Sequence, residues 1–119
     1  MASKQQVARF LEAFQRSMAK VGWLWIMNRD RNRDGLVAVG ITKRQREDVI
    51  RSLAPEDYCS GPLPDETRPG DVWVFGKHVE GTEVYIKLKL TQTEAPKCLS
   101  FHPAEYKLRY PFREKKEGR

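Results

Sequence analysis

Tyrosine, lysine and histidine side chains alternate with apolar residues in two strand-like segments near the carboxyl end of this 119-residue chain. Successive side chains of a strand point to opposite faces, so the aliphatic residues of TEVYIKLKLT (82–91) would face a core while Tyr85 and Lys87 face outward. His102 would face outward at the end of PKCLSFH (96–102). A phenol and an imidazole can transfer protons, and lysines can pair with phosphates. The combination predicts a face able to bind and cleave single-stranded RNA.

The expected cleavage uses the 2′-hydroxyl group of RNA and needs no metal or other cofactor. A base removes the proton of that hydroxyl, lysines neutralise the phosphorane, and an acid protonates the leaving 5′-oxygen. Histidine titrates closest to neutral pH and therefore suits either proton step.

Neighbouring positions add aromatic and basic side chains to this face. If Val72 and Val74 of the preceding strand point to the core, Trp73, Phe75 and Lys77 point outward. Aromatic rings stack unpaired bases, at about 1–3 kcal/mol per base. An alternative places the two aromatic residues in the core and leaves the lysines as solvated surface. The predicted outward face comprises Trp73, Phe75, Lys77, Tyr85, Lys87, Lys89, Ser100 and His102.

Cys59 and Cys98 are predicted to be reduced thiols without a catalytic role. They are far apart in the sequence and lie in no CxxC or metal-type spacing. Alternation in the last strand, with Leu99 and Phe101 pointing inward, places Cys98 outward. No third histidine or CxxC pair completes a zinc site, so no metal is predicted.

Two amphipathic helices are predicted from capping boxes followed by apolar residues at helical spacing. Ser3 with Gln6 opens a helix over 3–20, and Thr42 opens a second helix over 43–53.

The segment between these helices predicts a β-hairpin. Residues 22–28 and 36–41 are rich in branched or aromatic side chains, as strands are, and 28–35 is polar. The sequence DRNRDG begins like a calcium-binding loop, but the twelfth position is Ile41, where a bidentate glutamate is required. A polar hairpin turn is therefore predicted there, with arginines that could touch RNA phosphates.

The second half of the chain predicts a long loop followed by an antiparallel meander. Residues 54–70 hold four of the seven prolines and predict an irregular loop. Residues 71–102 predict three strands. The whole pattern predicts an α+β fold, an antiparallel sheet with helices packed on one face. We expect the chain to form one domain over 1–112, followed by a disordered basic tail over 113–119.

The bulk composition limits the class of protein. A net charge of +6 attracts phosphate polyanions and acidic proteins. No apolar run approaches the roughly 20 residues that span a bilayer. The start, MASKQQVARF, lacks the apolar segment of a secretory signal. We expect a cytoplasmic protein that makes no membrane contact.

Three stretches together resemble the motility quorum-sensing regulator family of bacterial toxins, over about residues 45–112. They are VIRSLAPEDYCSGPL, DVWVFGKHVEGTEVYIKLKL and CLSFHPAEYKLRYPF. The shared features are an L-x-x-x-D-Y helix exit, a G-x-E-V-Y-I-K strand and an S-F strand end. Members of this family are small basic mRNA-cleaving ribonucleases with a RelE-like fold, each neutralised by a cognate antitoxin.

The resemblance implies roles for individual positions. The catalytic tyrosine of the family falls on Tyr85, and the lysine two residues later is matched by Lys87. His102 stands where a catalytic lysine follows the S-F strand end, and imidazole can replace ammonium as a cation or an acid. The resemblance therefore implies Tyr85, His102 and Lys87 as catalytic residues.

Two positions depart from the family pattern. A family lysine falls near Ser60, and a family glutamine falls near Gly70 or Arg68. Lys77, Arg68 or a residue of the basic tail are the candidates to supply the missing charge.

The basic and aromatic segment AEYKLRYPFREKK (104–116) has three possible roles. It can pack back on the sheet, follow RNA, or receive an acidic segment of the antitoxin. We favour packing, since three aromatic side chains are costly to expose. The complete set of predicted RNA-binding residues is Lys77, Lys89, Trp73, Phe75, Arg109 and Arg113.

The leading hypothesis is therefore the toxin of a type II toxin–antitoxin system, a metal-independent endoribonuclease that cleaves mRNA. Its expected partners are mRNA, either free or ribosome-bound, and a cognate antitoxin protein. The alternatives are a non-catalytic RNA- or protein-binding module on the same fold, and an unrelated phage or mobile-element accessory protein.

Overall fold

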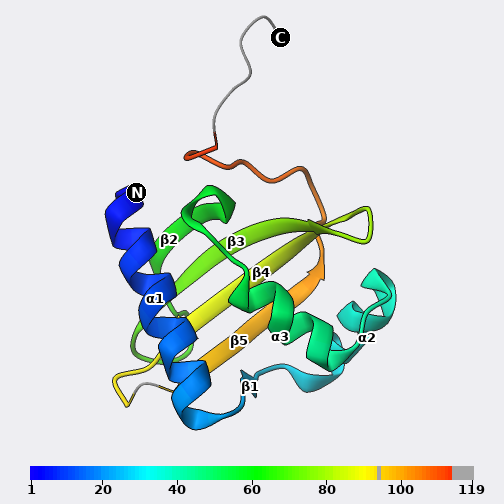
Figure 1. Ribbon diagram of the computed structural model, residues 1–119, viewed down its shortest axis with the longest axis horizontal. Coiled ribbons are helices and arrows are strands. Elements are labelled where there is room, and N and C mark those ends of the chain that lie inside the picture. Colours follow the sequence, from blue (N-terminus) through cyan, green and yellow to red (C-terminus); the bar gives the residue numbers. More distant parts are fainter. Residues whose placement is uncertain (94, 114–119) are drawn as a thin grey trace, which may run out of the picture.

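Five strands form one mixed sheet in the computed structural model of this chain, which describes residues 1–93 and 95–113 (Figure 1). The elements are α1 (Lys4–Val21), β1 (Trp25–Ile26), α2 (Arg29–Val39), α3 (Lys43–Arg51), the 3-10 turn η1 (Pro55–Asp57), β2 (Tyr58–Pro64), β3 (Asp71–Val79), β4 (Thr82–Leu90) and β5 (Pro96–Pro103). The strand order is β1-β5-β4-β3-β2. The α+β class is confirmed. An entirely antiparallel sheet is wrong, because β1 pairs parallel with β5.

Both helices predicted from capping boxes form. The Ser3 hydroxyl accepts a hydrogen bond from the Gln6 amide at 3.1 Å, and the Gln6 side chain accepts from the Ser3 amide at 2.8 Å. Thr42 and Gln45 make the same pair of bonds before α3. Local side-chain chemistry thus fixes where each helix starts.

The predicted hairpin is wrong, because its turn and second strand form the helix α2. Asn28 precedes this helix in a left-handed backbone conformation and ends β1 after two residues. Asn32, Leu36 and Val39 recur at helical spacing and are buried. The side-chain amides of Asn28 and Asn32 each donate to the Leu99 carbonyl oxygen of β5 at 3.2 Å. Helix α2 therefore continues along the edge of β5 where β1 stops.

The predicted irregular loop over 54–70 is also mostly wrong. Its first part forms η1 and β2, and β2 pairs antiparallel with β3 despite two irregularities in register. Tyr58 begins this strand with its side chain fully buried, stacked on Phe112 at 5.3 Å between ring centroids. Burial of this ring favours the strand over the loop that the prolines predict.

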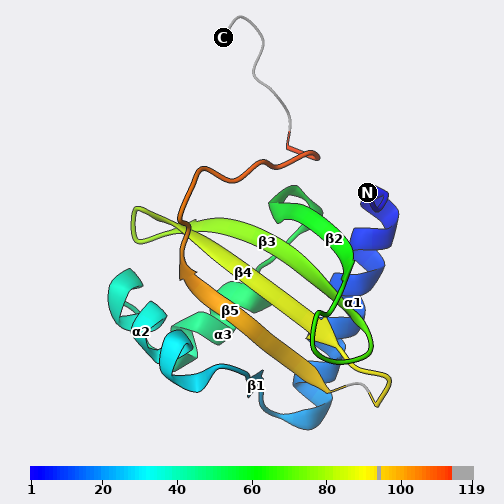
Figure 2. The same ribbon diagram turned by 180° about the vertical axis from the view of Figure 1, so that it is seen from behind.

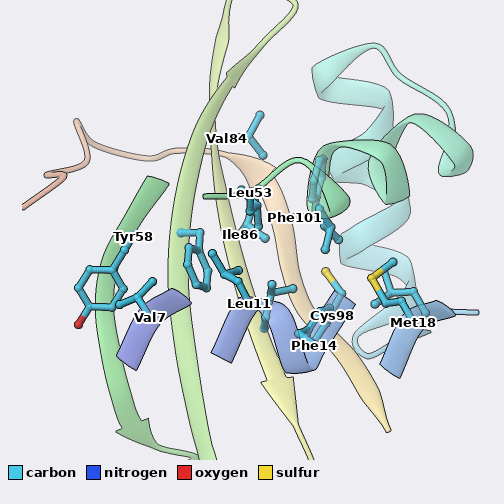
Figure 3. Close-up of a cluster of buried hydrophobic side chains, with 14 of the residues drawn as sticks. Val7, Leu11, Phe14, Met18, Leu53, Tyr58, Val84, Ile86, Cys98 and Phe101 are labelled. Atoms are coloured by element: carbon cyan, nitrogen blue, oxygen red, sulfur yellow. The ribbon is translucent and has the colours of Figure 1, made fainter. Parts of the chain in front are cut away.

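Helices α1 and α3 cover one face of the sheet, and Figure 2 shows the opposite face without a helix. We call these the covered face and the open face. In Figure 3, Leu11 and Phe14 of α1 point toward Ile86 and Phe101 of the sheet. All four side chains are at most 3 % exposed, so this layer forms the centre of the core.

The side chains of β3 point to the opposite faces from those predicted. Phe75 pairs with Ile86 on the covered face and is fully buried, and Trp73 stacks on Phe10 of α1 at 4.5 Å between ring centroids. Val74 pairs with Lys87 and so belongs to the open face. Trp73 and Phe75 are therefore core residues and cannot stack RNA bases. Both faces of β3 are apolar, so alternation alone cannot orient it.

Strand β5 contains a β-bulge that changes its alternation. Leu88 pairs with Cys98, whereas the next residue back, Lys87, pairs with Ser100, so Leu99 is the extra residue. Cys98 is consequently buried in the core instead of facing outward as predicted, and Leu99 lines the open face. His102 keeps its predicted outward position beyond the bulge.

Within residues 1–93 and 95–113, no helix combines the length and the apolar character needed to cross a membrane.

We predict that Gly35→Ala lowers the free energy of unfolding by about 2 kcal/mol. Gly35 lies where α2 meets β5, and a Cβ atom there would collide with the Phe101 carbonyl oxygen. This backbone collision outweighs the gain in helix propensity of about 1 kcal/mol. Urea unfolding measures the change. Val37→Ala, at an exposed position of the same helix, is the control and should change the value by less than about 0.5 kcal/mol. A stabilised Gly35→Ala protein would contradict the close packing of α2 on β5.

Candidate active site

Tyr85 and His102 face each other as a cross-strand pair of β4 and β5 on the open face. Their rings are stacked, with centroids 5.3 Å apart and planes 18° apart. Lys87 occupies the next outward position of β4, and its Nζ lies 6.0 Å from the centroid of the Tyr85 ring. The three residues predicted to be catalytic therefore lie together.

A hollow of about 230 Å³ opens over this pair. Its floor is formed by β4 and β5, and its rim by Arg31 of α2 and Tyr106 of the C-terminal segment. Arg31 and Lys87 form no ion pair within the described part of the chain. The hollow thus places two cations, Arg31 and Lys87, and one carboxylate, Glu105, beside a phenol and an imidazole. The position of Arg31 beside Tyr85 could not be predicted from the sequence, because its segment predicts a turn instead of a helix.

A larger groove, of about 1,140 Å³, extends from this hollow toward β2 and shares Tyr85 and Lys87 with it. It passes Ser60 and Val74 on the sheet side. On the other side, the C-terminal segment contributes Lys107 and Arg109. Arg109 was predicted to bind RNA, and it lines this groove on the open face.

The hydrogen bond of His102 fixes which ring nitrogen is free. Nδ1 lies 2.8 Å from the Pro103 carbonyl oxygen. A carbonyl oxygen only accepts, so Nδ1 carries the proton and donates it. In the neutral ring, Nε2 then keeps its lone pair and can act as a base.

Burial raises the pKa of Tyr85 above its usual value, and Tyr106 and Cys59 add to the shift. The phenol therefore keeps its proton at neutral pH and can donate it. Burial also raises the pKa of the Cys59 and Cys98 thiols to about 12. Neither cysteine is a thiolate at neutral pH, and both are free.

The C-terminal segment packs back across the open face and is held by Glu83. The carboxylate of Glu83 accepts from the Leu108 amide at 3.0 Å and from the Tyr110 hydroxyl at 2.8 Å. Burial alone would raise the pKa of Glu83, but these hydrogen bonds and the charges of His78 and Lys107 outweigh it, so the pKa falls below its usual value.

Three predicted RNA-binding cations form ion pairs within the fold. Lys89 is buried on the open face beneath the β2–β3 loop, with Nζ 2.7 Å from the Asp65 carboxylate. Lys77 points to the covered face and contacts Asp57 at 3.4 Å. Arg113 pairs with the other oxygen of Asp57 at 3.2 Å. Partner carboxylates distant in the sequence make these pairs, so spacing could not reveal them. Residues 114–119 of the predicted tail lie outside the described residues.

Metal ligands are not gathered in the part of the chain that the structure describes. No group of three or more histidine, cysteine, aspartate or glutamate side chains there lies close enough together to hold an ion. In comparisons with known proteins, no family model, no curated protein and no solved structure matches the chain.

We predict that Asp65→Asn lowers the free energy of unfolding at pH 7 by about 3 kcal/mol, because it leaves the Lys89 ammonium buried and unpaired. The hydrogen bond from Lys89, followed by that from the Thr67 amide, holds the pKa of Asp65 well below its usual range. A lowered carboxyl pKa stabilises the fold above about pH 4 and loses that contribution as the pH falls further.

Urea unfolding between pH 7 and pH 2 should therefore show the wild type converging on Asp65→Asn below about pH 4. Glu12→Gln removes the exposed Glu12–Arg16 pair and is the matched control, with an expected change below about 0.5 kcal/mol. A constant difference across the whole pH range would contradict the role of the Asp65 charge.

We also predict that Glu83→Ala releases the C-terminal segment. The loss of two hydrogen bonds to a carboxylate should speed hydrogen exchange of the Leu108 amide about tenfold or more. The amide of Ile86, in the centre of β4, is the internal control and should exchange at its original rate. Unchanged exchange at Leu108 would show that other contacts hold the segment.

Proposed function

We propose that this protein is a metal-independent endoribonuclease that cuts single-stranded mRNA, and that it acts as the toxin of a type II toxin–antitoxin system. The observation that carries the proposal is the stacked Tyr85–His102 pair, which lies beside Lys87 and Arg31 in one hollow of the open face. This hollow combines two groups for proton transfer with two cations for a phosphate.

The geometry supports a separate role for each side chain. His102 removes the 2′-hydroxyl proton through Nε2, and the 2′-oxygen then attacks the adjacent phosphorus. The bond from phosphorus to the 5′-oxygen breaks, which leaves a 2′,3′-cyclic phosphate on one product. Tyr85 donates its phenolic proton to the departing 5′-oxygen, and the cations Lys87 and Arg31 stabilise the phosphorane. Solvent then removes the added proton from His102 and returns a proton to Tyr85.

This division follows from the environments of the two rings. The bond of Nδ1 to Pro103 leaves Nε2 of His102 available to accept a proton. The raised pKa of Tyr85 keeps the phenol protonated and able to donate one.

The resemblance to the motility quorum-sensing regulator family supports the assignment and suggests a RelE-like fold in a cytoplasmic protein. The positions equivalent to the family tyrosine and to two of its lysines are Tyr85, Lys87 and His102. Ser60, where the family has a lysine, lines the adjoining groove. Arg31 lies in the same hollow as Tyr85 and can supply the cation that this departure removes. An antitoxin that covers the open face would block the site.

The test is cleavage of a long mRNA by the purified protein in excess EDTA, with the new ends mapped. We predict discrete cuts that leave 5′-hydroxyl ends. Tyr85→Phe and His102→Gln should each reduce the rate about 100-fold or more, because each removes a proton-transfer group. His78→Gln, at an exposed position of β3, is the matched control and should cut at the original rate. A substrate with 2′-deoxyribose at the cut site should resist cleavage.

Several outcomes would refute parts of the proposal. Equal cutting by wild type and both variants would refute the site. Activity that requires added Mg²⁺ would refute the metal-independent mechanism. Binding of RNA without cutting, even when ribosomes are added, would favour a non-catalytic RNA-binding module.

A further inference from the structure

A second hollow, of about 690 Å³, lies away from Tyr85 and His102, between β1, α2 and α3. Figure 1 shows α3 lying across the covered face of the sheet, with α2 and β1 on the side of β5. Trp23 and Trp25 line it, together with Arg29, Lys43 and Arg46. Its volume is typical of pockets that hold a small organic ligand. We call it the tryptophan hollow.

Arg46 is a buried charged group in this hollow, and Glu47 is the carboxylate whose charge acts on it. The residue is only 4 % exposed, and its Nε has no hydrogen-bond partner. No carboxylate of the described residues forms an ion pair with it. Burial lowers the pKa of Arg46 below its usual value. A buried guanidinium whose Nε lacks an acceptor destabilises the fold, so the side chain is suited to receive an anion from outside.

Two indole rings are exposed beside this cation. Trp23 is 57 % exposed and Trp25 is 47 % exposed, whereas Leu24 between them is buried. Both rings also line the tryptophan hollow. Exposed indoles next to a cationic pocket provide a surface on which a planar base can stack.

The surrounding charges favour an anionic ligand. Arg29 and Lys43 form no ion pair within the described residues. The two carboxylates of the lining are each paired with an arginine, Asp30 with Arg33 at 3.7 Å and Glu47 with Arg51 at 3.3 Å. A nucleoside phosphate uses both features of the hollow, with its phosphate on Arg46 and its base on a tryptophan. An acidic peptide would use the cations, but its carboxylates would leave the indoles exposed.

We propose that the tryptophan hollow binds a nucleoside phosphate unit of single-stranded RNA. This inference deepens the proposed function and rests on it for the identity of the ligand. Helix α2 contributes Arg29 to this hollow and Arg31 to the hollow above Tyr85 and His102. Two residues apart on an α-helix, these arginines point to nearly opposite sides of α2, so an RNA strand that crosses α2 would reach both hollows.

The test uses an eight-nucleotide RNA with 2′-O-methyl groups, which cannot be cut through the 2′-oxygen. Binding to the full chain is measured by quenching of tryptophan fluorescence. Trp25→Ala should weaken binding about tenfold, the effect of one lost base stack. Arg46→Met should weaken it at least tenfold. It should also leave the unfolding temperature without RNA unchanged or raised, because an apolar side chain replaces an unpaired buried charge.

Controls separate this site from general charge and from the hollow on the open face. Arg9→Gln removes an exposed cation of α1 and should change the affinity less than threefold. With cleavable RNA, Trp25→Ala should raise KM and leave kcat unchanged, since its ring is distant from the reacting bond.

The outcomes distinguish this inference from the proposed function. Unchanged affinity in both Trp25→Ala and Arg46→Met would overturn the inference, even where the wild type cuts RNA. Affinity that depends on Trp25 and Arg46, without cleavage of any RNA, would support it and refute the nuclease. Binding of uridine or adenosine monophosphate as tight as that of the oligonucleotide would assign the hollow to a free nucleotide and overturn the RNA contact. Displacement of the oligonucleotide by polyglutamate at equal charge concentration would likewise overturn it.

Discussion

The antiparallel pairing of β4 with β5 is the interaction on which the rest of the structure depends. It places Tyr85 opposite His102 and Lys87 opposite Ser100 on one face, and Ile86 opposite Phe101 on the other. The register of β4 against β5 therefore positions the side chains of the core and those of the candidate site at once, because alternate side chains of a strand point to opposite faces. The bulge at Leu99 is part of this arrangement. It lets the strand place a buried thiol and two outward polar side chains within five residues.

The positive charge of the chain is divided between structural and available groups. Lys77 and Arg113 share the carboxylate of Asp57 and join the C-terminal segment to η1, and Lys89 fixes the β2–β3 loop through Asp65. These cations are already neutralised and add little attraction for an anion nearby. Four cations without an ion pair among the described residues, Arg29, Lys43, Arg31 and Lys87, instead line the two hollows beside α2. The arrangement of pairs, and not the net charge of +6, therefore determines where a polyanion would bind.

Features set by neighbouring residues could be predicted from the sequence, and features set by distant partners could not. The capping boxes fixed the starts of α1 and α3, and alternation placed Tyr85, Lys87 and His102 on one face. Helix α2 was missed because DRNRDG is typical of a turn, although Asn32, Leu36 and Val39 have helical spacing. The orientation of β3 was missed because Val72 and Val74 are as apolar as Trp73 and Phe75, so only the packing of Phe10 selects a face.

The environment of Arg46 differs from that of the cations that stabilise the fold. A folded chain gains nothing from a guanidinium that is buried without an acceptor, and an aliphatic side chain of similar size would fill the same space at lower cost. The structural cations Lys77, Lys89 and Arg113 all have carboxylate partners, so this protein can satisfy buried or half-buried charge where the fold requires it. Arg46 is left without such a partner where two indoles are also exposed. A ligand that carries an anionic group and a planar ring would give Arg46 an acceptor and would cover the exposed indoles.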